Sequence, residues 1–324
     1  MKCTNKHLLC GLCIVAALVT GCGDKQALSN AYDAYSYNQS FTNQNLSVST
    51  GYFAEELCVT NAINFGTEDT YAEVAQGAGV FNVSTGEVLY NQDIFKKLYP
   101  ASTTKILTAY VILKDCKLTD VVTISASAVD QAEDSQTCGF KEGDNVTVKD
   151  LLYGLMLHSG NDAAEALAEY HSGSVEAFGE VMTKEAHKLG ATNSQFRNPS
   201  GLPDKEHYTS VYDMYLIFNE AIKNETFVKI INTRSHNMVY TNANGATVEK
   251  TFYSHSRYET GSVDIPEGFE IIGGKTGTTY DAGYCLVLYS KNSAGEDIIS
   301  IVFKADGPHN LYLLMNEILS KFAN

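Results

Sequence analysis

The sequence predicts an α/β fold in which an antiparallel sheet is flanked by helices and accompanied by an all-α lobe. Strand-like runs occur within 77–90 and again within 269–303, on either side of a section dominated by amphipathic helix patterns. A last segment, 311–322, presents one apolar face and should pack on the sheet. With 324 residues, the chain can form one large domain or two lobes around a full core.

The first strands should form a hairpin spanning 77–90, because two β-rich runs flank a turn that ends in glycine. Pro100 and Ser102 stand where a helix should begin, ahead of the apolar run 106–113. A short strand is expected at 120–124.

The middle of the chain should be helical, and Thr147 to Asp150 resembles a capping box that opens its first helix. Helices are expected at 151–157, 162–171, 176–189 and 211–223. The last third returns to strands, with a run at 269–274 and a hairpin formed by 284–289 and 298–303.

The composition bears on which kinds of molecule the protein binds. The formal net charge is −15 and no basic stripe is visible, which argues against a nucleic-acid partner. Hydrophobic residues make up 44% of the chain, as in ordinary globular proteins.

The N-terminal stretch predicts export. Two lysines precede an apolar run, 8–19, that is too short to span a bilayer as a mature helix. The run ends in Val-Thr-Gly-Cys22, which resembles a bacterial lipoprotein signal with cleavage before Cys22 and a lipid on its sulfur. The alternative is an ordinary secretory signal with an incidental cysteine. Both place the protein outside the cytoplasm, and the first adds a membrane anchor.

These patterns divide the chain into a signal peptide (1–21), a polar tether (22–52) and a catalytic domain (53–324). The tether is rich in Ser, Asn, Gln and Tyr, and about thirty flexible residues would reach roughly 30 Å.

Metal and cofactor chemistry has no support. Outside the signal, the cysteines are Cys58, Cys116, Cys138 and Cys285, without C-x-x-C spacing, and no H-E-x-x-H occurs. We expect no cofactor. Either one disulfide or four free thiols fits this pattern.

Ser102 and Lys105 form a Ser-x-x-Lys pair at the start of the apolar helix. Three residues apart, they share a helix face. A serine hydroxyl becomes a nucleophile when a base takes its proton, and a desolvated neutral lysine can do this. The pair alone is weak evidence for a catalytic site, because roughly one Ser-x-x-Lys match is expected by chance in a chain this long.

Two partner motifs follow in order, Ser159-Gly160-Asn161 between helices and Lys275-Thr276-Gly277 at a strand. Together they resemble the penicillin-binding serine enzymes. Finer matches at 100–105, 157–164, 198–202 and 275–284 resemble serine-type D-Ala-D-Ala carboxypeptidases, the low-molecular-mass penicillin-binding proteins of peptidase family S11. The resemblance covers about 73–324 and implies a β-lactamase/transpeptidase-like fold.

The resemblance implies roles for the first two motifs. Ser102 would attack the carbonyl between two D-alanines while Lys105 takes its proton. The backbone N–H groups of Ser102 and Thr278 would hold the oxyanion. Ser159 would relay a proton to the leaving amine, and Asn161 would hold the substrate amide and steady Lys105.

The third motif would bind substrate. Lys275 would attract the terminal carboxylate and disfavour the protonated form of Lys105, and Thr276 would hydrogen-bond that carboxylate. Gly277 would let the strand edge approach the ligand backbone. Arg257 is either a second carboxylate ligand or a surface arginine.

The expected function is hydrolysis of the terminal D-alanine from peptidoglycan stem peptides, with β-lactams as inhibitors. The alternatives on the same fold are a β-lactamase or D,D-endopeptidase, and a penicillin-sensing module without turnover. The sequence lacks Glu-x-x-Leu-Asn, the motif of the deacylating glutamate of class A β-lactamases, and has glycine rather than aspartate at 160.

The lipoprotein hypothesis predicts that Cys22→Ser abolishes lipid labelling and releases the protein from membranes, because the thioether acceptor is lost. Fractionation after labelling with a fatty-acid probe measures both effects. A substituted protein that stays in the membrane fraction would show that another anchor exists.

Overall fold

The computed structural model describes residue 54 and residues 56–324, and Ala54–Asn324 form one compact unit. The predicted signal and tether, with Cys22, lie outside the described residues. Among the described residues, no helix is long and apolar enough to cross a membrane.

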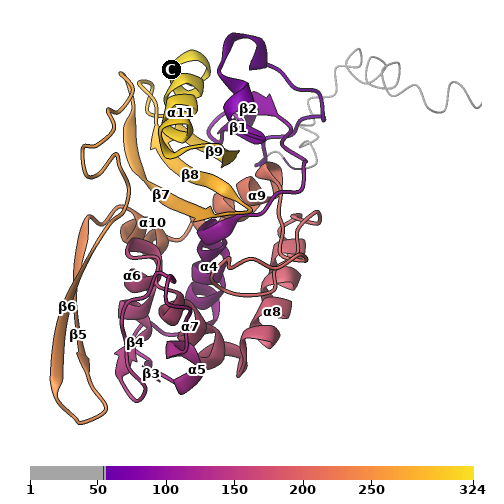
Figure 1. Ribbon diagram of the computed structural model, residues 1–324. Coiled ribbons are helices and arrows are strands. Elements are labelled where there is room, and N and C mark those ends of the chain that lie inside the picture. The colour runs from indigo at the N-terminus through magenta and orange to yellow at the C-terminus, as the bar shows by residue number, and fades with distance from the viewer. Residues whose placement is uncertain (1–53, 55) are drawn as a thin grey trace, which may run out of the picture. The chain divides into compact units, whose positions relative to one another are not determined.

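The centre of the fold is a five-stranded antiparallel sheet with the strand order β2-β1-β9-β8-β7 (Figure 1). Its strands are β1 (Gly77–Asn82), β2 (Glu87–Gln92), β7 (Glu270–Thr279), β8 (Gly283–Lys291) and β9 (Asp297–Ala305). The two ends of the chain thus build one sheet, as predicted. β7 lies at an edge, so within the described part of the chain no strand pairs with the backbone groups on its outer side.

The last helix, α11 (Pro308–Phe322), covers one face of this sheet (Figure 1). Its buried side chains, such as Leu314 and Ile318, join sheet residues in an apolar cluster of their own. Proline at its first position suits a helix start, where an N–H has no partner. The prediction that this helix packs on the sheet is confirmed.

The opposite face meets the helical lobe. Its helices are α4 (Lys105–Asp115), α5 (Ala126–Val129), α6 (Val148–Leu157), α7 (Asn161–Ser172), α8 (Val175–Lys188), α9 (Val211–Ala221) and α10 (Glu225–Ile231). Side-chain caps set several of their starts: Thr147 accepts from the N–H of Asp150 and begins α6, as the capping box predicted. α4 runs through the middle of the lobe and is buried on most sides.

A second sheet, with the order β3-β4-β5-β6, borders the lobe. It contains β3 (Val121–Thr123), β4 (Asn145–Thr147), β5 (Ser235–Thr241) and β6 (Thr247–Tyr253). The β5–β6 hairpin projects alongside α6 in Figure 1, and the sequence analysis did not predict it. Most of its side chains are exposed or half-buried, so its core pattern is weak.

The sequence left open one disulfide or four free thiols. In the described residues all four cysteines are free thiols: Cys58, Cys116, Cys138 and Cys285. Burial raises the pKa of Cys58 to about 11 and that of Cys285 to about 12.

Candidate active site

The segment ahead of α4 differs from the predicted helix start. Ala101–Thr104 form a turn of 3₁₀ helix, η3, and the α-helix begins only at Lys105. In 3₁₀ geometry residues i and i+3 eclipse one another, so Ser102 and Lys105 still lie on one side. Lys105 Nζ is 3.2 Å from Ser102 Oγ.

Lys105 is fully buried, and its other two polar contacts are neutral oxygens. Nζ donates to Asn161 Oδ1 and to the carbonyl of Ser200, both at 2.8 Å. A neutral amine has two N–H groups and one lone pair. In the neutral amine, with both N–H groups engaged by these oxygens, the lone pair is left for the Ser102 hydroxyl. Desolvation lowers the pKa of Lys105 well below its ordinary value, and the nearby Lys275 lowers it further.

The loop 198–202 holds the carbonyl that faces Lys105. Asn198 Oδ1 accepts from the N–H groups of Ser200, Gly201 and Leu202, which closes a tight turn. Gly201 has φ +84°, and a Cβ there would lie 1.8 Å from the carbonyl oxygen of Ala101. The loop therefore packs directly on η3.

His207, which no sequence motif predicted, fixes η3 from the same side. Its Nδ1 accepts from the backbone N–H of Arg197, so the ring proton lies on Nε2 and is donated to Thr104 Oγ1 at 2.8 Å. Burial lowers the pKa of His207 to about 4, which keeps the ring neutral. No sequence motif pairs residues 103 positions apart.

The second motif occupies the link between α6 and α7. Ser159 is buried and has φ +63°, a left-handed conformation that is costly for a residue with a Cβ. Asn161 begins α7, and the carboxylate of Asp162 accepts from the backbone N–H groups of Cys138 and Gly139. These bonds tie the link to the 138–140 segment.

The third motif lies on edge strand β7. Lys275 and Gly277 share one face of the strand, and a Cβ on Gly277 would lie 2.7 Å from the backbone nitrogen of Ser102. The expected reason for this glycine was close approach to a ligand. The structure adds a second reason, the close approach of β7 to the turn that carries Ser102.

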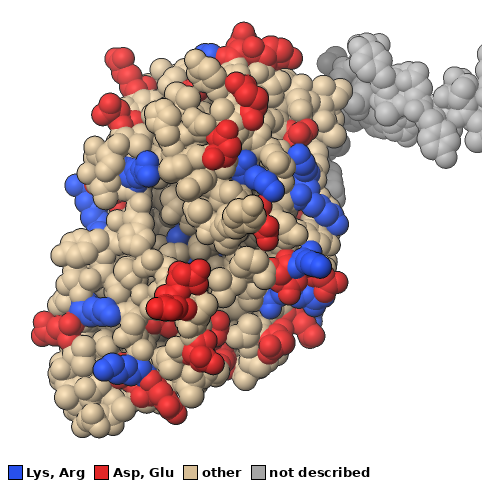
Figure 2. Space-filling model, viewed as in Figure 1, with Lys and Arg blue, Asp and Glu red and all other residues tan. Residues whose placement is uncertain are grey.

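Lys275 is buried, and its Nζ donates to the carbonyl of Thr276 at 2.9 Å. Desolvation lowers the pKa of Lys275 to about 7. Figure 2 shows a basic group inside the hollow on this face of the molecule, between the two halves.

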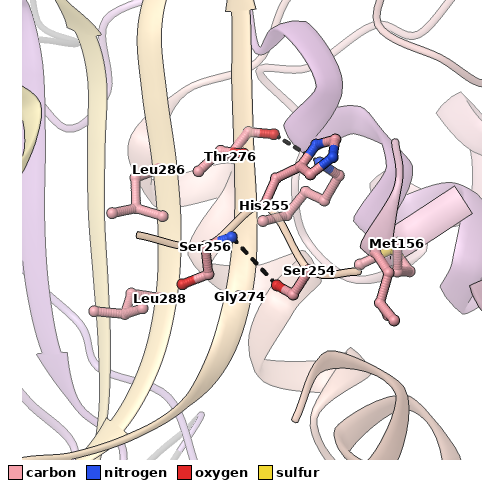
Figure 3. Close-up of a pocket in the computed structure, with 10 residues that line it drawn as sticks. Met156, Ser254, His255, Ser256, Gly274, Thr276, Leu286 and Leu288 are labelled. Atoms are coloured by element: carbon pink, nitrogen blue, oxygen red, sulfur yellow. Dashed lines mark hydrogen bonds between the residues drawn. The ribbon is translucent and has the colours of Figure 1, made fainter. Parts of the chain in front are cut away.

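Two adjoining cavities share β7. A cleft of about 380 Å³ is lined by Ser102, Asn161, Ser200 and Thr278, together with 134–136, 201–203 and 279–280. Lys275 and Thr276 instead line a smaller cavity with His255 and Met156 (Figure 3). Ser102, Asn161 and Thr278 therefore meet at the cleft, with Lys105 bonded to two of them from behind and Lys275 and Thr276 beside it, whereas Ser159 lines neither of these two cavities.

Two histidines border the smaller site and were not predicted. The rings of His158 and His255 have centroids 5.2 Å apart, and burial lowers the pKa of both. Arg257, two residues on, is directed elsewhere: its guanidinium lies over the ring of Tyr312, on α11, at 5.6 Å. Among the described residues, no group of three His, Cys, Asp or Glu side chains could hold a metal ion.

The family model for peptidase S11, D-alanyl-D-alanine carboxypeptidase, matches residues 66–307. The chain belongs to this family. The matched segment contains all three motifs, and the sequence-based identification is confirmed.

Two S11 relatives illustrate the similarity. D-alanyl-D-alanine carboxypeptidase DacF of Bacillus subtilis strain 168 is 34% identical over 242 residues, which cover 73% of this chain and 59% of DacF. A D-alanyl-D-alanine carboxypeptidase of Streptomyces sp. strain K15 is 33% identical over 246 residues, 73% of this chain and 82% of that protein. The chain spans only 55% to 63% of the length of DacF, Haemophilus influenzae DacA and Escherichia coli DacC.

The fold is shared with a solved structure. The crystal structure of the Streptomyces K15 DD-transpeptidase superposes with a TM-score of 0.70 at 30% identity, covering 76% of this chain and 95% of that one. The predicted α/β fold with an antiparallel sheet is confirmed.

The contact between Gly201 and η3 predicts that Gly201→Ala displaces Ala101 and misplaces Ser102. We expect a loss of about 2–4 kcal/mol in the free energy of unfolding, from backbone strain plus overpacking, and slower acylation by penicillin. Urea denaturation and the rate of adduct formation measure the two effects.

Gly245→Ala is the matched control, since Gly245 has φ +81° and nothing within 4 Å of an added Cβ. It should cost about 1 kcal/mol and leave acylation unchanged. Equal effects of the two substitutions would contradict the steric role of Gly201.

Proposed function

We propose that this S11 protein is a serine D,D-carboxypeptidase that removes the terminal D-alanine from peptidoglycan stem peptides through a penicillin-sensitive acyl-enzyme. The observation that carries the proposal is the buried Lys105 Nζ, which lies 3.2 Å from Ser102 Oγ and donates to the oxygens of Asn161 and Ser200. In the neutral amine these two bonds leave the lone pair for the Ser102 hydroxyl.

In the first step, Ser102 Oγ attacks the carbonyl carbon of the penultimate D-alanine and its proton passes to Lys105 Nζ. The carbonyl oxygen becomes an oxyanion, for which we propose the backbone N–H groups of Ser102 and Thr278 as donors. Both residues line the same cleft, and removing one such donor typically costs on the order of 100-fold in rate.

In the second step, the C–N bond breaks and the leaving D-alanine amine takes a proton, relayed from Lys105 by way of Ser159. The acyl group remains as an ester on Ser102. Water then attacks the ester, giving up a proton to the restored Lys105 amine, and Ser102 leaves with that proton. Atoms and charge balance without a metal or cofactor.

The stem peptide would lie along the outer edge of β7, which pairs only with β8 among the described strands. Lys275 and Thr276 would meet the terminal carboxylate, and Asn161 would contact the peptide amide while holding Lys105. A carboxylate beside Lys275 would supply the counter-charge that this buried ammonium lacks.

A second outcome of the same acyl-enzyme is transfer to an amine, which the K15 structure's description as a DD-transpeptidase favours. Water and amine compete for one ester, so the chemistry to that point is common. β-Lactamase, endopeptidase and sensor activity differ from the proposal in deacylation or in the bond attacked. The lipid on Cys22 and the extracytoplasmic location remain proposals that rest on the leader sequence.

The acyl-enzyme proposal predicts a long-lived penicillin adduct and, with a D-Ala-D-Ala peptide, release of free D-alanine. Intact-protein mass spectrometry and a D-alanine assay with glycine present as acceptor measure these outcomes. Ser102→Ala should abolish both, because the nucleophile is lost.

Rapid penicillin turnover would instead identify a β-lactamase, and an adduct without peptide turnover would identify a sensor. A glycine-capped product exceeding the hydrolysis product would identify a transpeptidase. Each of these results would overturn the carboxypeptidase assignment.

The lowered pKa of Lys105 and the lowered pKa of Lys275 predict that kcat/KM falls at both acid and alkaline pH. Activity should fall on the acid side as Lys105 gains a proton, and on the alkaline side as free Lys275, with a pKa of about 7, loses its charge. A peptide that ends in a carboxamide should lose the alkaline limb, since it presents no carboxylate to Lys275.

Lys105→Arg tests the acid limb, because arginine stays charged at accessible pH. Acylation should slow by about 10²- to 10⁴-fold while the fold is retained. Near-native acylation in this variant, or a profile that follows an ordinary lysine, would rule out the general-base role.

A further inference from the structure

A depression of about 410 Å³ on the flank of the molecule is lined by four lysines: Lys96, Lys97, Lys205 and Lys304. The chain as a whole carries a formal charge of −15, so this concentration of positive charge runs against its composition. Figure 2 shows basic side chains gathered over the segment that joins β2 to η3. We call this depression the lysine pocket.

The walls of the lysine pocket are fixed by backbone bonds. Leu98 and Thr209 exchange hydrogen bonds of 2.8 and 3.0 Å, and Gln195 and Tyr208 exchange bonds of 2.8 and 2.9 Å. The ammonium of Lys97 lies 4.2 Å from the centre of the Tyr208 ring. The lysines therefore project from a rigid frame with an aromatic side.

Lys304 reaches the pocket through a distortion of β9. The register of β8 and β9 shifts between Tyr284 and Leu286, so that Phe303 and Lys304 together oppose one residue. Lys304 has φ +55°, which is rare for a residue with a Cβ. A bulge of this kind re-aims a side chain, and here it aligns a fourth cation with the other three.

Carboxylates that neighbour these lysines in sequence are engaged elsewhere. Asp93 accepts from Asn64, Asp306 from Asn310, and Glu206 pairs with Arg197. Asp204, next to Lys205, accepts from the backbone N–H of Glu206. Among the described residues, no carboxylate oxygen forms a salt bridge with any of the four ammonium groups, and no acidic residue lines the pocket.

The lysine pocket adjoins the catalytic cleft. Lys97 precedes Ser102 by five residues, and Lys205 follows Pro203, which lines the cleft. Lys304 packs against the start of β8, next to the turn that carries Tyr280. A long ligand held in the pocket would therefore lie beside the cleft without filling it.

We infer that the lysine pocket binds a linear phosphate-bearing polyanion. Four unpaired ammonium groups spread over one rigid depression match a chain of spaced anionic groups. All four are lysines, which bind phosphate oxygens as point charges. The inference does not depend on the proposed hydrolase activity.

The test measures binding of the full-length chain to short-chain inorganic polyphosphate by titration calorimetry at low and moderate salt. Binding should weaken as salt rises, because bound counterions are released. Replacing Lys96, Lys97, Lys205 and Lys304 together by glutamine should weaken it by on the order of 100-fold or more. All four are outside the catalytic machinery, so acylation by penicillin should persist and report a folded protein.

The matched control replaces four other exposed lysines by glutamine and so has the same net charge: Lys117, Lys141, Lys149 and Lys229. It should bind polyphosphate within about twofold of the native chain. An equal loss in both variants, or no binding by the native chain, would overturn the inference.

Two further probes test the ligand class. Poly-glutamate of matched charge should bind more weakly than polyphosphate, and equally tight binding would overturn the assignment to phosphate. Vesicles of phosphatidylglycerol test a flat anionic surface. Binding to vesicles in the absence of binding to soluble polyphosphate would overturn the linear-chain ligand in favour of a membrane.

Discussion

Burial of the Lys105 amine among neutral oxygens is the constraint on which the rest of the site depends. The contacts of Nζ within hydrogen-bond distance are a hydroxyl, an amide oxygen and a backbone carbonyl. A carboxylate at any of these positions would stabilise the ammonium and remove the base. The three oxygens come from η3, from the start of α7 and from the loop 198–202, so three parts of the lobe must meet at one atom.

Bringing these three segments to one atom requires backbone conformations with positive φ, which residues with a Cβ rarely adopt. Ala101 and Ser159 have φ of +48° and +63°, and Gly201 has φ +84° where it touches Ala101. Each such conformation costs a residue with a Cβ about 1–3 kcal/mol, and the surrounding bonds must offset it. The Asn198 turn and the Nε2–H of His207 do so on one side of η3. The strained backbone and the hydrogen bonds that stabilise it thus belong to the same few elements.

Local signals explain why much of this could be predicted from sequence. The capping box at Thr147 predicted the start of α6, and continuous runs of strand-forming apolar residues predicted β1, β8 and β9. The catalytic pair was visible because its members are three residues apart. The β5–β6 hairpin was missed because its exposed faces carry little apolar alternation, although Asn244-Gly245 marks a turn there.

The features that were not predicted depend mainly on contacts between residues far apart in the sequence. His207 bonds to Thr104 across 103 residues, and Gly277 packs against the backbone of Ser102, 175 positions earlier. The short helix α10 was not predicted either, although the side chain of Asn224 caps it by accepting from two backbone N–H groups. Contacts of this kind depend on how distant segments pack, and a single sequence holds no periodicity that reports them.

Two buried lysines share the catalytic region, and their mutual repulsion links substrate binding to base strength. The charge of Lys275 lowers the pKa of Lys105, which favours the neutral amine in the free enzyme. In the proposed reaction, a substrate carboxylate beside Lys275 offsets that charge. The affinity of Lys105 for the Ser102 proton then rises when a substrate with a free C-terminus is present. Recognition of the terminal carboxylate and activation of the nucleophile become one electrostatic event.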